Sequence, residues 1–382
     1  MRLRLSLAWK NLWRNRRRTL INLAAMSVGC AALMVAIALT DGLLDELQKN
    51  VTEVLCGDAQ VHAPGFQKER NLRLALSPKE VTDVLARAAE AHLAAAPRAI
   101  GFGLIAQKAR SAGGELMGVD PRAERAFGGL ADRVESGAFL PDEPKKLAVL
   151  GQKLAKLLEA KVGDELVVVV QAADGSMGSM LLHVGGVLTG VGEGVDRSLA
   201  LIDRRDFAEL FSTEGVHEIA LTSHSAMTPE RVKAIALAGA PQADVRTYRE
   251  LLPQVASLEQ LWGVATWLMA IIFSLAAGLG VLNAMLMAQY ERIPEFGLLK
   301  ALGTTPARIV GDVLIESVFL GLVSLAAGLT LGGALVYYLH TVGLDIGGSE
   351  QLNVSGVLFG TSWKARWSLS VVLQPALVTL LT

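Results

Sequence analysis

The sequence predicts an α-helical membrane protein with four transmembrane helices, the fourth of them truncated, and a large α+β domain inserted between the first and the second. No charged residue occurs in residues 19–40, 260–290 or 317–344. Each stretch exceeds the roughly 20 residues that cross the hydrocarbon core of a bilayer. A fourth uncharged stretch, residues 367–382, is shorter than a span, so we expect the chain to stop part-way through its last helix.

These stretches divide the chain into eight segments. They are an interfacial amphipathic helix over 1–18, transmembrane helices over 19–41, 259–290, 313–340 and 367–382, an external α+β domain with stalk helices over 42–258, an inner loop over 291–312 and a short external loop over 341–366.

Charge decides the orientation and excludes one class of partner. Basic residues without any acidic neighbour precede the first span, and Asp41, Asp45 and Glu46 follow it. Because cytoplasmic flanks of membrane helices carry an excess of Lys and Arg, the N-terminus is predicted inside and the large domain outside. The whole chain holds 36 basic and 37 acidic residues, a balance that argues against nucleic acid as a partner.

The N-terminal segment has two features of its own. Leu5, Ala8, Trp9, Leu12 and Trp13 follow a helical spacing among arginines, which is typical of a helix lying in the membrane interface. The first turns of one longer helix are the alternative. A cleaved signal peptide is disfavoured because the apolar run continues well past the cysteine at position 30, and two cysteines make no disulfide framework.

The first two spans are expected to continue outward as a stalk. Apolar residues at alternating spacings of three and four follow the first span over 44–54 and precede the second over 251–261, the pattern of packed helices. Ordinary surface helices capping a globular domain are the alternative.

Inside the insertion, short strands and helices alternate and predict an α+β domain of two lobes. Ser77, Pro78 and Glu80 open a helix that should run to about Ala95. A hairpin turn is expected at 111–114 and a second turn at 174–176. Strands are predicted over 100–109, 115–119, 147–150, 165–171 and 180–188, and helices over 152–158, 203–211 and 229–237.

No catalytic constellation emerges, so the chain is not predicted to be an enzyme. The sequence contains no Gly-x-x-x-x-Gly-Lys-Ser/Thr phosphate loop, and energy from ATP would have to come from a partner. Residues 190–194 are rich in glycine but lack the spacing and the following helix of a dinucleotide site, so a turn is expected. His217 and His224 have no zinc-ligand spacing, and the histidines are expected at the surface. No metal or cofactor is expected on this chain.

Within the membrane, small residues recur at every fourth position. Ser324, Gly328 and Gly332 do so on the third span, and Ser274 and Gly278 on the second. Small residues at this spacing let helix backbones approach closely, so these are candidate helix-packing positions; the ordinary glycine content of membrane helices is the alternative. No charge lies in the middle of any span, which argues against an ion site or a hydrophilic solute pathway.

The loop between the second and third spans predicts a short amphipathic helix. Pro294 suits its first turn and Gly303 its left-handed stop. One face would carry the apolar residues Ile293, Phe296, Leu299 and Leu302, and the other Glu295 and Lys300. A connector without any partner is the alternative.

This loop resembles the signature of the FtsX-like permease family, which includes MacB and the lipoprotein-releasing permeases LolC and LolE. The resembling residues are Glu291-Arg292, Glu295-Phe296-Gly297, Lys300-Ala301-Leu302-Gly303 and Glu316. The resemblance extends over nearly the whole chain, at 7–12 with the arginines 16–18, 60–65, 118–121, 162–164 and 247–251. It departs at the C-terminus, where the rest of the fourth helix and a basic tail would be expected.

The resemblance implies a type VII ABC transporter permease of a bacterial inner membrane, multi-pass, with its large domain in the periplasm. It implies a homodimer or a heterodimer with a paralogous permease, served by two cytosolic ATPase subunits that bind ATP and Mg²⁺. Such permeases couple ATP hydrolysis to periplasmic work by mechanotransmission. The implied ATPase-coupling residues are Glu291, Arg292, Glu295, Phe296, Gly297, Leu299, Lys300, Leu302 and Gly303, with Phe296 and Leu299 as anchors.

Within the family, release of outer-membrane lipoproteins is favoured, because residues 60–65 and the long insertion look more like that branch. A periplasmic lipoprotein chaperone or adaptor and membrane lipid would then be further partners. Efflux of peptides or antibiotics is the alternative. Regulation of cell-wall hydrolases is disfavoured by the size of the insertion, and a membrane-bound enzyme by the missing catalytic residues.

Overall fold

The computed structural model describes residues 16–189, 191–224, 226–345, 353–354, 357–358 and 362–381. The chain divides into two compact units. A helical unit comprises Met1–Asp45, Leu258–Gly347 and Thr361–Thr382, and a sheet unit comprises Glu46–Ser257 and Gly348–Gly360. The predicted interfacial helix lies outside the described residues up to position 15.

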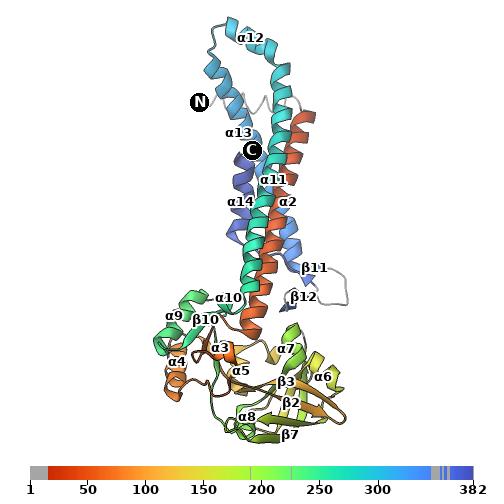
Figure 1. Cartoon of the computed structure of the whole chain (residues 1–382). Helices are drawn as coiled ribbons and strands as arrows, with labels where there is room; N and C mark the ends of the chain where they lie inside the picture. The colour runs from red at the N-terminus through yellow and green to blue at the C-terminus, as the bar shows by residue number, and fades with distance from the viewer. Residues whose placement is uncertain are drawn as a thin grey trace. The chain divides into compact units, whose positions relative to one another are not determined.

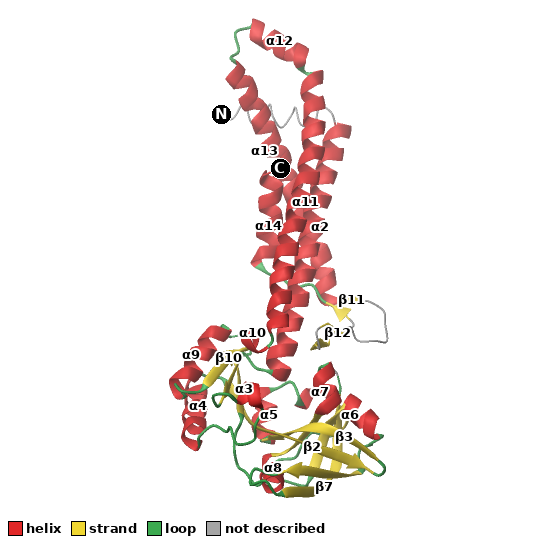
Figure 2. Cartoon of the chain, in the orientation of Figure 1, coloured by secondary structure: helices red, strands yellow, loops and turns green. Residues whose placement is uncertain are grey.

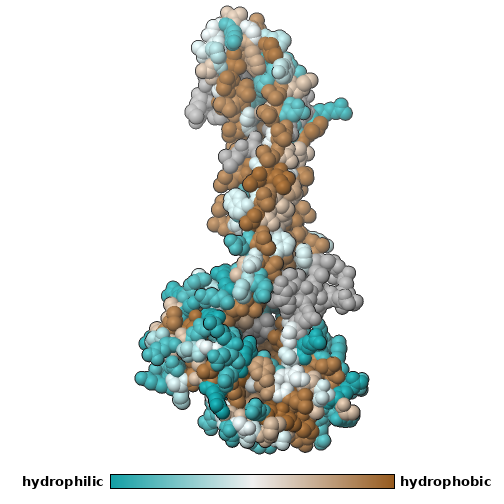
Figure 3. All heavy atoms as spheres, in the orientation of Figure 1, coloured by the Kyte–Doolittle hydropathy of each residue, from teal (hydrophilic) through white to brown (hydrophobic). Residues whose placement is uncertain are grey.

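In the helical unit, four helices run side by side (Figures 1 and 2). They are α2 (Arg16–Lys49), α11 (Pro253–Glu291), α13 (Pro306–Thr341) and α14 (Leu369–Leu381), and a short helix, α12 (Ile293–Ala301), joins α11 to α13. Figure 3 shows mostly brown, apolar side chains along this unit. Among the described residues, three helices are long and apolar enough to cross a membrane, and α14 is a shorter apolar helix.

Helix α2 is the most enclosed of the three long helices. Half of its apolar window is buried, against 6% for the window of α11. Leu33, Met34, Ile37 and Ala38 form a cluster with single residues of α11, α13 and α14. Both α2 and α11 also extend past the predicted limits of their spans, to Lys49 and from Pro253.

The segment before α14 and the first turn of α14 are held to α2 by polar contacts. The Asp41 carboxylate accepts hydrogen bonds from Ser368 at 2.6 Å and Ser370 at 2.9 Å, and Asp45 pairs with Arg366. The Arg366 N–H donates to the Ala38 carbonyl at 2.9 Å. Asp41 and Asp45, which indicate the orientation of the first span in the sequence, therefore also connect α2 to the residues before and at the start of α14.

The sheet unit is built on one mixed sheet. Its strands are β1 (Ala59–His62), β2 (Ala94–Gln107), β3 (Arg110–Val119), β4 (Val134–Gly137), β5 (Leu147–Gly151), β6 (Glu165–Gln171), β7 (Met177–Leu188), β8 (Leu199–Asp203), β9 (Glu218–Thr222) and β10 (Asp244–Thr247). Their order is β10-β1-β9-β2-β3-β8-β5-β7-β4, and β6 pairs with both β2 and β7. Strands β2, β3, β8, β5, β7 and β6 therefore close into a barrel, while β9, β1 and β10 extend from β2.

The helices of this unit cover the sheet. They are α3 (Phe66–Glu69), α4 (Pro78–Glu90), α5 (Pro121–Phe127), α6 (Gln152–Leu158), α7 (Glu193–Ser198), α8 (Arg204–Phe211), α9 (Pro229–Gly239) and α10 (Tyr248–Leu251), with a π-helix over Asn50–Leu55 and a 3-10 turn over Ala131–Arg133. Two-residue strands β11 (Leu344–Asp345), β12 (Asn353–Val354), β13 (Val357–Leu358) and β14 (Ser362–Trp363) follow α13.

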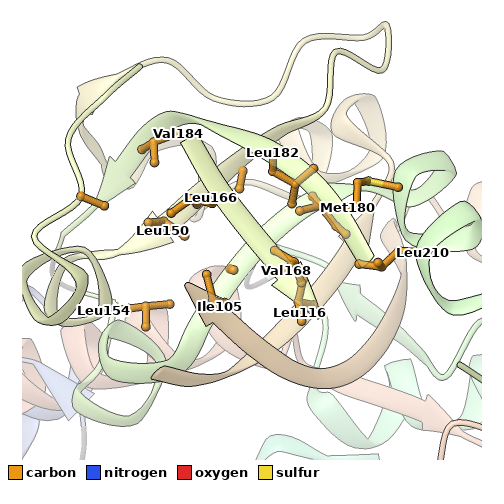
Figure 4. Close-up of a cluster of buried hydrophobic side chains, with 14 of the residues drawn as sticks. Ile105, Leu116, Leu150, Leu154, Leu166, Val168, Met180, Leu182, Val184 and Leu210 are labelled. Carbon is orange, nitrogen blue, oxygen red and sulfur yellow. The ribbon is translucent and has the colours of Figure 1, made fainter. Parts of the chain in front are cut away.

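The sheet unit has three large clusters of buried apolar residues, one of which includes Met117, Val149 and Leu201 of β3, β5 and β8. The barrel interior is filled by alternate residues of its strands, among them Ile105, Leu116, Leu166 and Leu182 (Figure 4), as expected for a closed sheet. The second core lies between α4, α9 and the strands β1, β9 and β10.

Three local predictions were wrong. Helix α4 ends at Glu90 rather than near Ala95, because β2 already begins at Ala94. The β2–β3 hairpin turns at Lys108-Ala109, with Lys108 at φ +52°, and not at 111–114. Gly114 instead lies inside β3, where an added Cβ would stand 2.7 Å from Ile105. Finally, a helix, α7, does follow the glycine-rich stretch near 192.

Candidate functional site

The inner loop that carries the sequence-predicted site residues folds as helix α12, and both of its ends are fixed by local chemistry. Arg292 stands at the N-cap and Pro294 in the first turn. At the other end Gly303 has φ +88°, its N–H donates to the Lys300 carbonyl, and the Thr304 N–H donates to the Leu299 carbonyl, each at 3.0 Å. This pair of bonds is a Schellman motif. The predicted left-handed stop at Gly303 is therefore present.

Arg292 fixes the start of α12 against α13. Its guanidinium lies 2.9 Å from the Glu316 carboxylate on α13 and 3.5 Å from Glu295 on α12. It also lies over the Phe296 ring, 5.5 Å from the ring centroid. Arg292 and Glu316 are both mostly buried, with 19% and 18% of their side chains exposed. Arg292 therefore links the start of α12 to α13 through a single hydrogen bond from its Nη1 to the Glu316 carboxylate.

The apolar side chains of α12 differ in how much of them a partner could cover. Leu302, Leu298 and Ile293 are 76%, 65% and 55% exposed, and Leu299 is 41% exposed. Phe296 is half-buried beneath Arg292. Of the two expected anchors, Leu299 is thus accessible, whereas Phe296 packs within the loop itself.

The two-faced pattern predicted for α12 is only partly present. Glu295 is half-buried against Arg292, while Lys300 and Gly297 are exposed. Leu298 adds an exposed apolar side chain away from the predicted stripe. Glu291, the last residue of α11, is also exposed. The helix thus presents exposed apolar side chains on more than one side.

The small residues of α13 lie where its backbone approaches α2. An added Cβ at Gly328 would stand 2.7 Å from the Cys30 Cβ, and one at Gly332 would stand 3.0 Å from the Ala31 Cα. The hydroxyl of Ser27 donates to the Ser324 carbonyl oxygen at 3.0 Å. The structure brings these three positions together on one face, whereas Ser274 and Gly278 on α11 are only half-buried.

Sequence reasoning missed a buried charged network in the sheet unit. Arg98 on β2 is 1% exposed and donates to Glu124 at 2.6 Å and to Glu218 at 3.0 Å. Glu218 also accepts from Gln60 at 3.1 Å, and the Gln60 amide oxygen lies 3.0 Å from His62 Nε2. Polar residues inside otherwise apolar strands were the available signal, but the sequence does not say which of them meet.

The expectation of surface histidines was wrong for two of them. His62 and His217 are fully buried, and each stacks on the Phe66 ring, at centroid distances of 5.7 and 5.4 Å. The Ile100 N–H donates to His217 Nδ1 at 3.0 Å, and His217 Nε2 lies 2.8 Å from the Leu72 carbonyl. That pattern fits the neutral ring, and burial lowers the pKa of both histidines.

Comparison with known proteins covers both units. Residues 267–382 match the FtsX-like permease C-terminal model. Residues 19–248, more than half of the chain, match the model of the MacB-like periplasmic core domain.

Among relatives, the lipoprotein-releasing system transmembrane protein LolC of Neisseria meningitidis is 24% identical over 328 residues, covering 82% of this chain and 76% of that protein. The macrolide export ATP-binding/permease protein MacB of a Shewanella species is 38% identical over 105 residues, covering 24% of this chain and 16% of that protein. The extracellular domain of the noncanonic ABC-type transporter YknZ superposes on 47% of this chain and 90% of its own, at 14% identity and a TM-score of 0.35, which is too loose to argue from. The two family models together assign the chain: it belongs to the FtsX-like ABC transporter permeases of the MacB and LolC type.

Proposed function

We propose that this chain is the permease subunit of a transporter that releases lipoproteins from a bacterial inner membrane, with energy from a separate ATPase subunit that docks at α12. The observation that carries the proposal is the breadth of the similarity to LolC, which includes both units over 82% of this chain. In this proposal the N-terminus is cytoplasmic, the sheet unit is periplasmic, and ATP and Mg²⁺ are bound by the ATPase. The functional complex would hold two permease chains and two ATPase subunits.

Three features of α12 support it as the docking element. Its termini are fixed by Pro294 and by the Schellman motif at Gly303. Its start is linked to α13 by the ion pair of Arg292 and Glu316. Its apolar side chains are exposed at a place where the charged residues Glu291 and Lys300 border them. A rigid apolar surface that is bordered by charged side chains is suited to binding a protein partner.

Work would pass to the sheet unit along α11. This helix runs without interruption for 39 residues, from Pro253 to Glu291, which lies next to α12. At 1.5 Å per residue, its length is about 58 Å. A helix of this kind transmits displacement without absorbing it at a loop. Within the single chain, 6% of the apolar window of α11 is buried.

A release assay tests the substrate. The chain, co-purified with its ATPase, is placed in vesicles that hold a triacylated lipoprotein, and release into the soluble fraction is measured with ATP and an acceptor chaperone. We expect ATP-dependent release that stops when the ATPase is inactivated. Hydrolysis without release, in a complex that hydrolyses ATP normally, would overturn lipoprotein release while leaving the permease assignment intact.

Efflux of peptides or antibiotics is the second candidate. It is favoured by the higher identity to MacB, 38%, over the shorter region that the two chains share. A complex that lowers macrolide accumulation in cells, and releases no lipoprotein, would select it.

Orientation is tested by thiol labelling. In a variant without the native cysteines at 30 and 56, a cysteine at Gly113 should react with a membrane-impermeant reagent in intact spheroplasts, and one at Thr304 should not. Gly113 is exposed and leaves open space for a side chain. Labelling of Thr304 alone would reverse the topology.

A further inference from the structure

A cavity of about 460 Å³ lies in the sheet unit where strands β3 and β8 end, and the proposed function does not use it. Its volume falls within the range of about 300 to 1,000 Å³ that small-molecule sites occupy. The charged residues of its lining come from the start of α5, the start of α8 and the loop before β5, and they are Asp120, Arg122, Asp142, Asp203, Arg204 and Arg205.

The cavity occupies a place in the fold at which ligands commonly bind. Strands β3 and β8 are neighbours and run parallel, so their carboxyl ends lie at the same edge of the sheet, and α5 and α8 follow them within two residues. The two helices then go to opposite faces. Phe127 of α5 packs with Ala96 of β2, whereas Phe211 of α8 lies against Gly101 of the same strand, and an odd separation along a strand reverses the face. Sheets with helices on both faces bind small ligands in such a crevice.

The carboxylates of the lining already have partners. Asp142 accepts a hydrogen bond from the Arg122 guanidinium at 2.8 Å and another from Arg125. Asp203 accepts two from the Arg205 guanidinium, each at 2.9 Å. Both of these acidic side chains are therefore paired with arginine.

The one charged lining residue without a partner is Arg204. Asp120 accepts from the backbone N–H groups of Arg122 and Ala123, at 2.9 and 3.4 Å. The Arg204 side chain is half-buried, and no residue of the described chain forms a hydrogen bond or an ion pair with its guanidinium. The group left to be satisfied in this cavity is thus a positively charged donor.

We propose that this cavity binds a small polar molecule with a single carboxylate, which the guanidinium of Arg204 holds. A planar guanidinium can donate two parallel hydrogen bonds to a carboxylate. The three carboxylates around the cavity disfavour a ligand of higher negative charge, such as a phosphate monoester. The body of the ligand is expected to be polar, because Pro121 is the one apolar residue of the described lining. The inference does not rest on the proposed transport function.

Three sugars that share a pyranose ring test the charge requirement. Glucuronate, glucose and glucose 6-phosphate carry a carboxylate, a hydroxyl group and a phosphate at the same end of the molecule. They are titrated calorimetrically into the full chain in lipid nanodiscs, with empty nanodiscs subtracted. We expect saturable binding of glucuronate at least about tenfold tighter than that of glucose, since hydrogen bonds between charged groups are the stronger ones. Glucose 6-phosphate should bind more weakly than glucuronate.

An arginine variant places the binding in this cavity. Arg204→Gln should weaken glucuronate about tenfold and leave glucose unchanged. The matched control is Arg231→Gln, at an exposed arginine of α9 outside the cavity, which should change neither. Neither change removes a contact between residues of the described chain, so the unfolding midpoint of the sheet unit should stay the same in both variants.

A second variant should increase binding, which a folding defect would not do. Asp120→Asn removes one of the three nearby negative charges and keeps a residue that caps a helix well. It should tighten glucose 6-phosphate at least about twofold and leave glucose unchanged.

Five outcomes would each overturn the proposal. They are equal affinities for glucuronate and glucose, the absence of saturable glucuronate binding, glucose 6-phosphate binding more tightly than glucuronate, unchanged glucuronate binding in a folded Arg204→Gln chain, and unchanged glucose 6-phosphate binding in the Asp120→Asn chain.

Discussion

Truncating the exposed leucines of α12 is the most direct perturbation of the proposed ATPase contact. Leu302 and Leu299 are 76% and 41% exposed, and only this exposed part of each side chain remains for a partner to cover. Full burial of a leucine contributes about 1.5 to 3 kcal/mol. Scaled by the exposed fractions, the two side chains together would contribute about 1.7 to 3.5 kcal/mol to docking.

The double variant Leu299→Ala/Leu302→Ala should therefore bind the ATPase between about twentyfold and about three hundredfold more weakly. The measurement is the amount of ATPase that co-purifies with tagged permease, followed by a titration of purified ATPase against permease in nanodiscs. Folding should be unaffected, because the lost groups contact little of the permease itself. The Phe296→Ala variant should weaken docking less, since that ring already lies under Arg292.

The matched control is Leu275→Ala/Leu279→Ala on α11. These leucines are 61% and 64% exposed and lie in the charge-free stretch of α11, away from α12. The same chemical change there should leave ATPase recovery unaltered. Full recovery of ATPase by the α12 variant, or an equal loss in the α11 control, would refute the assignment of α12 as the docking element.

Three other expectations concern stability. Gly328→Ala should destabilise the helical unit by about 1 to 3 kcal/mol, because the added methyl group overpacks against Cys30. Gly297→Ala, with open space for its Cβ, should not destabilise it. Detergent-induced unfolding measures both variants, and equal unfolding midpoints would contradict close packing of α13 on α2. Glu124→Gln removes the charge of one carboxylate that Arg98 contacts and leaves the Glu218 carboxylate in place. It should cost about 1.5 to 3 kcal/mol in urea unfolding of the sheet unit, the contribution of a hydrogen bond to a charged group, and an unchanged unfolding midpoint would contradict a stabilising role of this buried pair. Burial lowers the pKa of His217 below its ordinary 6.5, so the unfolded chain binds the proton more readily, and the stability of the sheet unit is fully present above pH 6.5 and falls as the pH drops below it. His217→Asn should reduce this acid-side loss in urea midpoints compared between pH 7.5 and 5.5, with the part due to His62 remaining, while an unchanged pH dependence would assign the effect to another group.

How much of the fold followed from the sequence depended on the range of the interactions involved. Helix α6 and strand β6 occupy the predicted residues, and the Ser77 capping box with Glu80 is present. The helix, the strand and the capping box each depend on residues only a few positions apart in the sequence. Hydrophobic periodicity and capping residues therefore predict them directly. The inner helix was predictable for the same reason, from Pro294 and Gly303.

The wrong predictions share a different cause. Residues 94–99 have helix-favouring alanines, yet they form the start of β2 because β9 and β3 pair with them from distant parts of the chain. The glycines at 113 and 114 resemble a turn, yet Gly114 is needed inside β3 where Ile105 leaves no room for a side chain. Local propensity gives way where long-range pairing decides.

The sequence by itself determined the features that depend on one short segment at a time. These are the charge-free spans, the basic N-terminus, the residues that begin and end α12, and the motifs that identify the permease family. Only the tertiary structure decided which side chains meet. It closed β6 onto β2 to form the barrel, buried Arg98 between Glu124 and Glu218, and turned Phe296 inward beneath Arg292. The physical reason is that a buried charge or ring is stabilised by partners brought together from far along the chain, and no local pattern of residues specifies those partners.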